Sequence, residues 1–237
     1  MNHTPTIPTL DAEHQRILDE MEDGTLKTRL IRILQTPVRE PPPTPPPLTA
    51  ESLTQEARRR LDRAGWQESM STPAITQALC RAYAEAMLSA PRRGLLLLGG
   101  TGCGKTMAAK AIWTRSRLVE LCDPGEVQRL EEDEDLGRVK VHVILNDLGA
   151  EPEIRYRKNN DFVGNWLLRR HALWEHGHAA PVSITTNLPI YAQKDYQGDR
   201  PPPSIEGNYG QRVLSRILHM TIPITIHGPD RRQRITL

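Results

Sequence analysis

A glycine-rich octapeptide constrains this chain more than any other feature. It has the sequence Gly99-Gly100-Thr101-Gly102-Cys103-Gly104-Lys105-Thr106 and fits the pattern G-x-x-x-x-G-K-[ST]. Because glycines lack a Cβ atom, they let backbone N–H groups approach anionic oxygens closely. The octapeptide therefore predicts a loop that holds nucleotide phosphates, in which Lys105 faces the β- and γ-phosphates and Thr106 offers its hydroxyl to Mg²⁺.

The residues on either side of the octapeptide support this prediction. An apolar run over 95–98 predicts a buried strand, and an alanine-rich run over 107–113 predicts a helix. A helix directly after the loop points the positive end of its dipole at the phosphates. The alternative, a glycine-rich turn that binds nothing, leaves this ordered series of strand, loop and helix unexplained.

Composition narrows the class of protein. The chain has 237 residues, enough for one domain and an extension, and its net charge of +2 is too small to indicate nucleic acid by itself. One Phe, four Trp and five Tyr leave no visible aromatic platform for stacked bases. The cysteines at 80, 103 and 122 have no paired spacing, and no apolar run reaches membrane-spanning length. We therefore expect a cytoplasmic protein that does not contact a membrane.

A proline-rich run over 41–47 divides the chain. Its prolines cannot donate backbone hydrogen bonds and favour an extended spacer. The predicted organisation is a helical segment over 1–36, a linker over 37–48 and a domain over 49–237. The N-terminal segment is too small to fold well alone, so it either docks on its own domain or binds another protein as a tethered hook. The spacer favours the hook.

Strand and helix patterns alternate beyond the linker. Helices are predicted over 51–64, from 73 onward, and over 107–113, 161–174 and 209–218, and strands over 95–98, 139–145, 182–186 and 220–226. The acidic run over 131–135 is predicted to be a solvated loop. This alternation indicates a parallel sheet that is covered by helices on both faces.

Polar residues follow two of the predicted strands. Asn146, Asp147 and Glu151 come after one of them, and Asn187 comes after the next. In phosphate-loop ATPases an acidic residue at the first of these places holds Mg²⁺, and a neighbouring carboxylate orients the attacking water. A polar side chain at the second place could contact the γ-phosphate and that water.

Two arginines four residues apart, Arg212 and Arg216, share one face of a predicted helix. The more common explanation of such a pair is a basic surface. The functional alternative is an arginine finger, which reaches the γ-phosphate of a neighbouring subunit.

Five motifs, in this order, resemble the DnaC/DnaI-type helicase loaders and their relative IstB, which belong to the AAA+ ATPases. The motifs are GGTGCGKT, NDLGAE, TTNLP, YGQRVLSR and HGPDRR, and the resemblance covers about residues 50–237. It implies an α/β fold, the AAA+ P-loop NTPase three-layer sandwich with a five-stranded parallel sheet, and ATP and Mg²⁺ as cofactors. By this resemblance Asn187 matches the sensor-one position and Arg216 the finger, with Arg212 one turn before it.

The chain departs from the family at one position. Asn146 falls where the family has a Mg²⁺-holding Asp, and Asp147 falls at the water-orienting carboxylate. An amide keeps an oxygen ligand but loses a negative charge, so the affinity for the metal should fall. Asp147 or Glu151 could compensate. We therefore expect that ATP binding is retained and that hydrolysis is slow.

The resemblance also implies partners. The N-terminal segment would hold a replicative hexameric DNA helicase, the ATPase domains would self-associate, and single-stranded DNA would bind the inner side of that assembly. The candidate DNA contacts are Arg115, Arg117, Arg155, Arg157 and Lys158. Two alternatives stay open: an IstB-like helper of a DNA transposase, and a nucleotide-dependent adaptor without useful ATPase activity.

Overall fold

The computed structural model describes residues 47–66, 72–135, 140–151, 159–192 and 202–230. The chain divides into two compact units, 1–47 and 48–237, and the described helices and strands all belong to the second. The predicted N-terminal segment over 1–36 and most of the linker over 37–48 lie outside the described residues. Among the helices that are described, none has the length and apolar character needed to cross a membrane.

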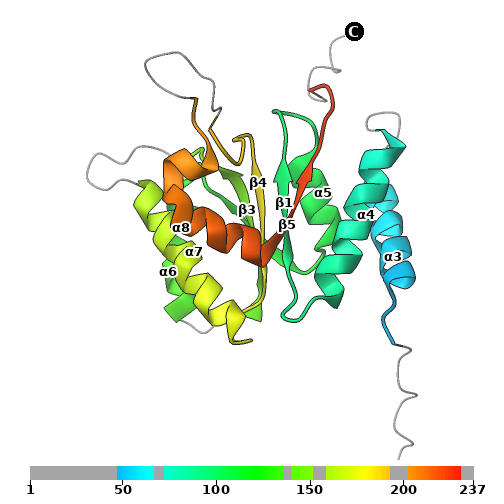
Figure 1. Cartoon of the computed structure of the whole chain (residues 1–237), viewed down its shortest axis with the longest axis horizontal. Helices are drawn as coiled ribbons and strands as arrows, with labels where there is room; N and C mark the ends of the chain where they lie inside the picture. The colour runs from blue at the N-terminus through cyan, green and yellow to red at the C-terminus, as the bar shows by residue number, and fades with distance from the viewer. Residues whose placement is uncertain (1–46, 67–71, 136–139, 152–158, 193–201, 231–237) are drawn as a thin grey trace, which may run out of the picture. The chain divides into compact units, whose positions relative to one another are not determined.

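Six helices and five strands make up the described part of this unit (Figure 1). The helices are α3 (Ala50–Arg63), α4 (Pro73–Leu88), α5 (Lys105–Ile112), α6 (Pro124–Asp135), α7 (Asn159–Glu175) and α8 (Ile205–Met220). The strands are β1 (Gly94–Leu98), β2 (Ser116–Glu120), β3 (His142–Leu148), β4 (Val182–Thr186) and β5 (Thr221–Thr225).

The five strands form one parallel sheet in the order β2-β3-β4-β1-β5. Strand β4 therefore lies between β1, which precedes the glycine-rich loop, and β3, which carries the Asn146-Asp147 pair. This arrangement confirms the predicted α/β three-layer sandwich with a five-stranded parallel sheet.

The sheet is the middle of three layers (Figure 1). Helices α6, α7 and α8 cover one face, and α3, α4 and α5 cover the other. Side chains of β1 alternate between the two cores: Leu96 and Leu98 pack in the first, and Leu95 and Leu97 pack in the second. Because both faces of the strand are buried, its sequence is a continuous apolar run instead of an alternating one.

One prediction from the sequence is wrong in this region, and one strand was missed. Residues 131–135, predicted to be a loop, belong to helix α6. Val127 and Leu130, one helical turn apart, are buried in the core, and this packing anchors a helix that continues through the acidic residues. Strand β2 was not predicted at all, because only Val119 among its five residues is fully buried and the sequence shows no clear apolar pattern.

Strand β3 begins and ends three residues later than predicted. It includes Asn146 and Asp147, which the sequence placed after the strand, and it ends at Leu148. The pairing with β4 shifts between Leu145 and Leu148, so that two residues of β3 lie opposite Thr185 of β4. This is a β-bulge, and it brings Leu148 back to the core face that Leu145 occupies.

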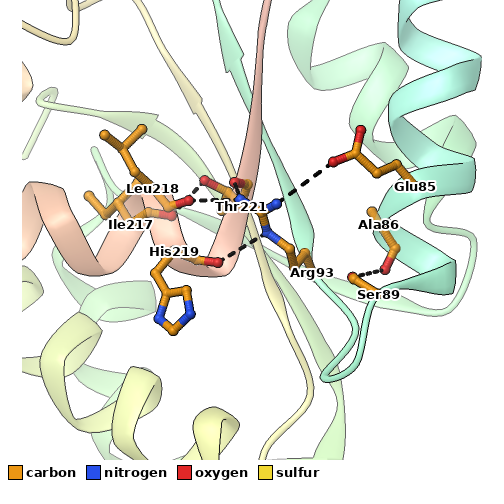
Figure 2. A network of polar contacts seen from close by, with 8 residues as sticks. All are labelled: Glu85, Ala86, Ser89, Arg93, Ile217, Leu218, His219 and Thr221. Atoms are coloured by element: carbon orange, nitrogen blue, oxygen red, sulfur yellow. Dashed lines mark hydrogen bonds and ion pairs between the residues drawn. The ribbon is translucent and has the colours of Figure 1, made fainter.

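Arg93, directly before β1, joins three elements (Figure 2). Its Nη2 donates to the carbonyl oxygens of Leu218 (2.8 Å) and Thr221, and its Nε donates to the carbonyl oxygen of His219 at 3.0 Å. Its Nη1 also lies 3.8 Å from a carboxylate oxygen of Glu85 on α4. The last carbonyls of a helix lack partners within the helix, so this guanidinium stabilises the end of α8 where β5 begins.

Strand β5 forms one edge of the sheet and has a proline at its centre. Pro223 pairs with Leu96 of β1 and is exposed. A proline interrupts the row of backbone donors, and sheets tolerate it at an edge.

We expect Gly94→Ala to destabilise the protein by about 2 kcal/mol or more, the cost of overpacking a core. A Cβ atom at this position would lie 1.8 Å from the carbonyl oxygen of Val182, in the backbone of the adjacent strand. The measurement is the free energy of unfolding by denaturant.

Gly164→Ala is the matched control. Gly164 lies inside helix α7, where a Cβ atom would meet a methyl group of Val213 at an ordinary 3.5 Å. Alanine favours a helix over glycine by about 1 kcal/mol, so this variant should be as stable as the parent or more stable. Equal stability of the two variants would contradict the close approach of β1 and β4.

Candidate nucleotide site

The glycine-rich loop connects β1 to α5 and needs glycine at particular positions. Gly104 is the N-cap of α5 and has φ of 98°, a conformation that other residues rarely adopt. Gly99 has φ of 148°, and a Cβ atom there would lie 2.2 Å from the carbonyl oxygen of Ile226. The loop therefore depends on glycine both for its turn and for close contact with the chain after β5.

Lys105 is buried although it is charged, and its ammonium group is fully bonded. Nζ donates to the carbonyl oxygens of Gly99 and Gly100, both at 2.8 Å, and to Oδ1 of Asn187 at 2.7 Å. Asn187 follows β4, the strand beside β1. The structure thus brings together Lys105 and Asn187, which the sequence predicted as parts of one site.

Asn146 is the centre of a second network. Its Oδ1 accepts hydrogen bonds from the hydroxyls of Thr106 (2.6 Å) and Thr185 (2.7 Å). Its Nδ2 donates to Oε2 of Glu120 at 2.6 Å and lies 3.4 Å from Oδ2 of Asp147. Since a carboxylate only accepts hydrogen bonds, Glu120 fixes which way the amide points: nitrogen toward β2 and oxygen toward Thr106.

Asp147 has φ of 58°, a left-handed conformation that is uncommon for a residue other than glycine. Its backbone N–H donates to the Thr185 hydroxyl at 3.0 Å, and this bond holds the bulge. Local strain of this kind is often found at functional sites.

A pocket lies over the N-terminus of α5, at the carboxyl ends of the parallel strands. Its lining residues are Thr101, Gly102, Gly104, Lys105, Thr106, Met107, Asp147 and Asn187. Ligands of open parallel sheets bind at this edge. The lining combines an ammonium group and the amides of a helix N-terminus, which suit phosphate, with the carboxylate of Asp147.

The oxygen donors at this site suit Mg²⁺ in kind. A hydroxyl (Thr106), an amide oxygen (Asn146) and a carboxylate (Asp147) are hard ligands, and Mg²⁺ usually keeps water molecules and substrate phosphates as its others. Asn146 supplies no charge, however, and its oxygen already accepts two hydrogen bonds.

Glu151 does not line this pocket. Its Oε1 accepts a hydrogen bond from the phenol of Tyr209 at 2.6 Å, and its Oε2 accepts one from the backbone N–H of Gly149 at 3.0 Å. Burial, and then the Glu151 charge, raise the pKa of Tyr209, so the phenol stays protonated and remains a donor. A catalytic role for Glu151 stays a prediction, and it would require these bonds to break.

Arg212 and Arg216 also lie outside the pocket lining. Both are exposed on α8, after a kink at Gly210 (φ 81°). Of the predicted DNA contacts, Arg115 is exposed, and Arg117 is paired with Glu126 of α6 at 3.4 Å. The other three, at 155, 157 and 158, lie outside the described residues.

Two carboxylates at this site were not predicted from the sequence. Glu120 ends the unpredicted strand β2, directly beside Asn146 in register. Asp230 lies against the glycine-rich loop, since a Cβ atom on Gly102 would fall 1.7 Å from its Oδ1. Recognising 116–120 as a strand beside β3 could have identified Glu120, whereas Asp230 lies within the HGPDRR motif, to which the sequence analysis assigned no site role.

Among known proteins, the chain is similar to solved structures of helicase loaders. No protein-family model and no curated protein matches it. The chain is similar to the DnaC helicase loader, with 22% identity, a TM-score of 0.38, and coverage of 57% of this chain and 78% of that one. It is also similar to DnaI, with 26% identity, a TM-score of 0.36, and coverage of 59% and 73%.

We expect Asn146→Asp to destabilise the protein by about 2 kcal/mol, because the amide donor that satisfies Glu120 is replaced by a second carboxylate at the same short distance. The double variant Asn146→Asp with Glu120→Gln should recover most of this loss, since glutamine can donate to the new carboxylate.

A double-mutant cycle measures this coupling. It uses the free energies of unfolding by denaturant of the parent, of Asn146→Asp, of Glu120→Gln and of the double variant. A coupling free energy near zero would contradict the Glu120–Asn146 contact.

Proposed function

We propose that this chain binds ATP and loads a replicative hexameric DNA helicase onto single-stranded DNA. The observation that carries the proposal is the pair of contacts Lys105–Asn187 and Thr106–Asn146. Through these contacts, three of the motifs that resemble the helicase loaders meet at one edge of the sheet. A glycine-rich turn without a ligand would not need these partners.

The glycine-rich loop supports the proposal that the chain binds ATP. The backbone amides at the start of α5 and the buried ammonium of Lys105 offer positive charge to the phosphates. When phosphate oxygens replace the loop carbonyls as partners of Nζ, Asn187 stays next to Lys105 and can contact the γ-phosphate. Asn187 would then act as a sensor beside the bond that is cleaved.

Hydrolysis is proposed to be slow. Thr106, Asn146 and Asp147 would hold Mg²⁺, whose charge stabilises the phosphates when it is bound. Asp147 is the carboxylate in the pocket lining and would orient the attacking water. Because Asn146 is neutral, the metal has one negatively charged ligand fewer than in the family pattern. This difference supports ATP binding with little ATP hydrolysis.

Arg216 is proposed to complete the site of a neighbouring subunit. It is exposed and lies outside the pocket of its own chain, as a finger acting between subunits requires. ATP bound between two ATPase domains would then couple self-association of the chains to binding of the helicase. Binding of the helicase is assigned to residues 1–36, as expected from the proline-rich spacer.

The missing charge at Asn146 favours one second candidate, a nucleotide-dependent adaptor that does not turn over ATP. ATP turnover by the parent, measured with single-stranded DNA and the helicase present, separates the two candidates. Measurable turnover would favour the slow ATPase over the adaptor.

We expect Arg216→Ala to bind ATP like the parent but to lose hydrolysis, while Lys105→Ala loses ATP binding. Mixing the two inactive variants should restore part of the ATPase activity, because Arg216→Ala still binds ATP and Lys105→Ala still supplies the arginine finger. The measurements are nucleotide affinity and steady-state phosphate release, with Arg63→Ala as a control for an exposed arginine on α3. Loss of ATP binding in Arg216→Ala would mean that this residue acts within its own subunit.

We expect the full chain to co-elute with its cognate replicative helicase in the presence of ATP, and a chain lacking residues 1–36 to lose this binding but retain ATP binding. Transfer of the helicase to circular single-stranded DNA measures the loading step. If neither form binds the helicase and the full chain instead binds a transposase, the transposition alternative replaces the loader.

A further inference from the structure

Two histidine side chains meet between helices α7 and α8, away from the nucleotide pocket. Nε2 of His171 lies 2.9 Å from Nδ1 of His219, and neither residue lines the pocket. Such a pair can share a proton, or both nitrogens can bind one metal ion.

A carboxylate completes the group. Glu175 lies one helical turn after His171 on α7, with Oε2 3.8 Å from Nδ1 of that histidine. The three side chains can each offer one ligand atom, with all three atoms within 4.8 Å of one another. Within the described ranges, no other group of three His, Cys, Asp or Glu side chains meets this criterion.

The surroundings hold the two imidazoles in place. His171 is buried, and the ring of Trp174 contacts both histidines, with centroids 5.6 Å from His171 and 5.2 Å from His219. The backbone of His219 is held by Arg93, and Figure 2 shows its imidazole directed away from that guanidinium. A preorganised pair loses little side-chain entropy when it binds an ion.

The charge state of His171 also suits a metal. Burial lowers the pKa of His171, and the nearby Arg216 lowers it further, while Glu175 acts in the opposite direction. At neutral pH the imidazole is therefore uncharged, which is the form that ligates metals. The Glu175 carboxylate offsets part of the ion's charge, and its exposed side chain can move to the metal.

We propose that His171, His219 and Glu175 form a binding site for a divalent transition-metal ion of the Zn²⁺ class. Two imidazole nitrogens and one carboxylate oxygen suit Zn²⁺, Co²⁺ or Ni²⁺, whereas Mg²⁺ and Ca²⁺ require oxygen ligands. Ligand atoms around tetrahedral Zn²⁺ are roughly 3.3 Å apart, given Zn–N bonds of about 2.05 Å, so the two nitrogens need to separate by only a few tenths of an ångström. Glu175 and His219 are exposed, which leaves a fourth position open to water.

Co²⁺ titration of the full-length protein tests the site, because tetrahedral Co²⁺ has a strong visible absorption and Zn²⁺ displaces it. We expect one Co²⁺ per chain with this spectrum in the parent. His219→Ala should weaken binding by more than roughly tenfold, since changes even beyond the direct ligands have effects of that size. Glu175→Gln should weaken it less and is a second test should His219→Ala fold poorly.

His178→Ala is the matched control, because His178 is exposed shortly after α7 but lies outside the group of three. It should bind Co²⁺ as the parent does. Three results would overturn the proposal: no tetrahedral Co²⁺ spectrum in the parent, undiminished affinity in both His219→Ala and Glu175→Gln, or an equal loss in His178→Ala.

Discussion

The parallel pairing of β4 with β1 on one side and with β3 on the other is the constraint on which this structure depends. It places the ends of three strands side by side, so that Lys105, Asn187 and Asn146 come from distant parts of the chain to one edge of the sheet. The close approach also explains Gly94, where the β4 backbone leaves no room for a side chain. Pocket, loop and polar network are consequences of this one strand order.

Charge around position 146 is carried by its neighbours. Asn146 is neutral, but its nitrogen contacts Glu120 and lies near Asp147, so two carboxylates flank it. An aspartate at 146 would face both of them in a buried place, whereas the amide satisfies Glu120 and still presents an oxygen to Thr106. The asparagine is therefore well matched to its neighbours, and the role of position 146 cannot be judged from that residue alone.

Much of the fold and part of the site could be predicted from the sequence, for identifiable physical reasons. The loop after β1 depends on local glycine geometry. Strand β1 is a continuous apolar run because both of its faces are buried, and β4 is rich in the β-branched residues that favour strands. Strand β2 was missed because a mixed, half-exposed edge strand has no clear period. The bulge at Asn146 and Asp147, and the contact of Glu151 with Tyr209, depend on partners at least 38 residues away along the chain, which no local pattern records.

One edge of the sheet bears on how copies of this chain can associate. Strand β5 forms that edge and carries Pro223 at its centre. A proline on an edge strand discourages the addition of a further strand from another molecule. The sheet is thus poorly suited to extend through β5 into a second copy, and contacts between copies on this side would have to form through helices and loops.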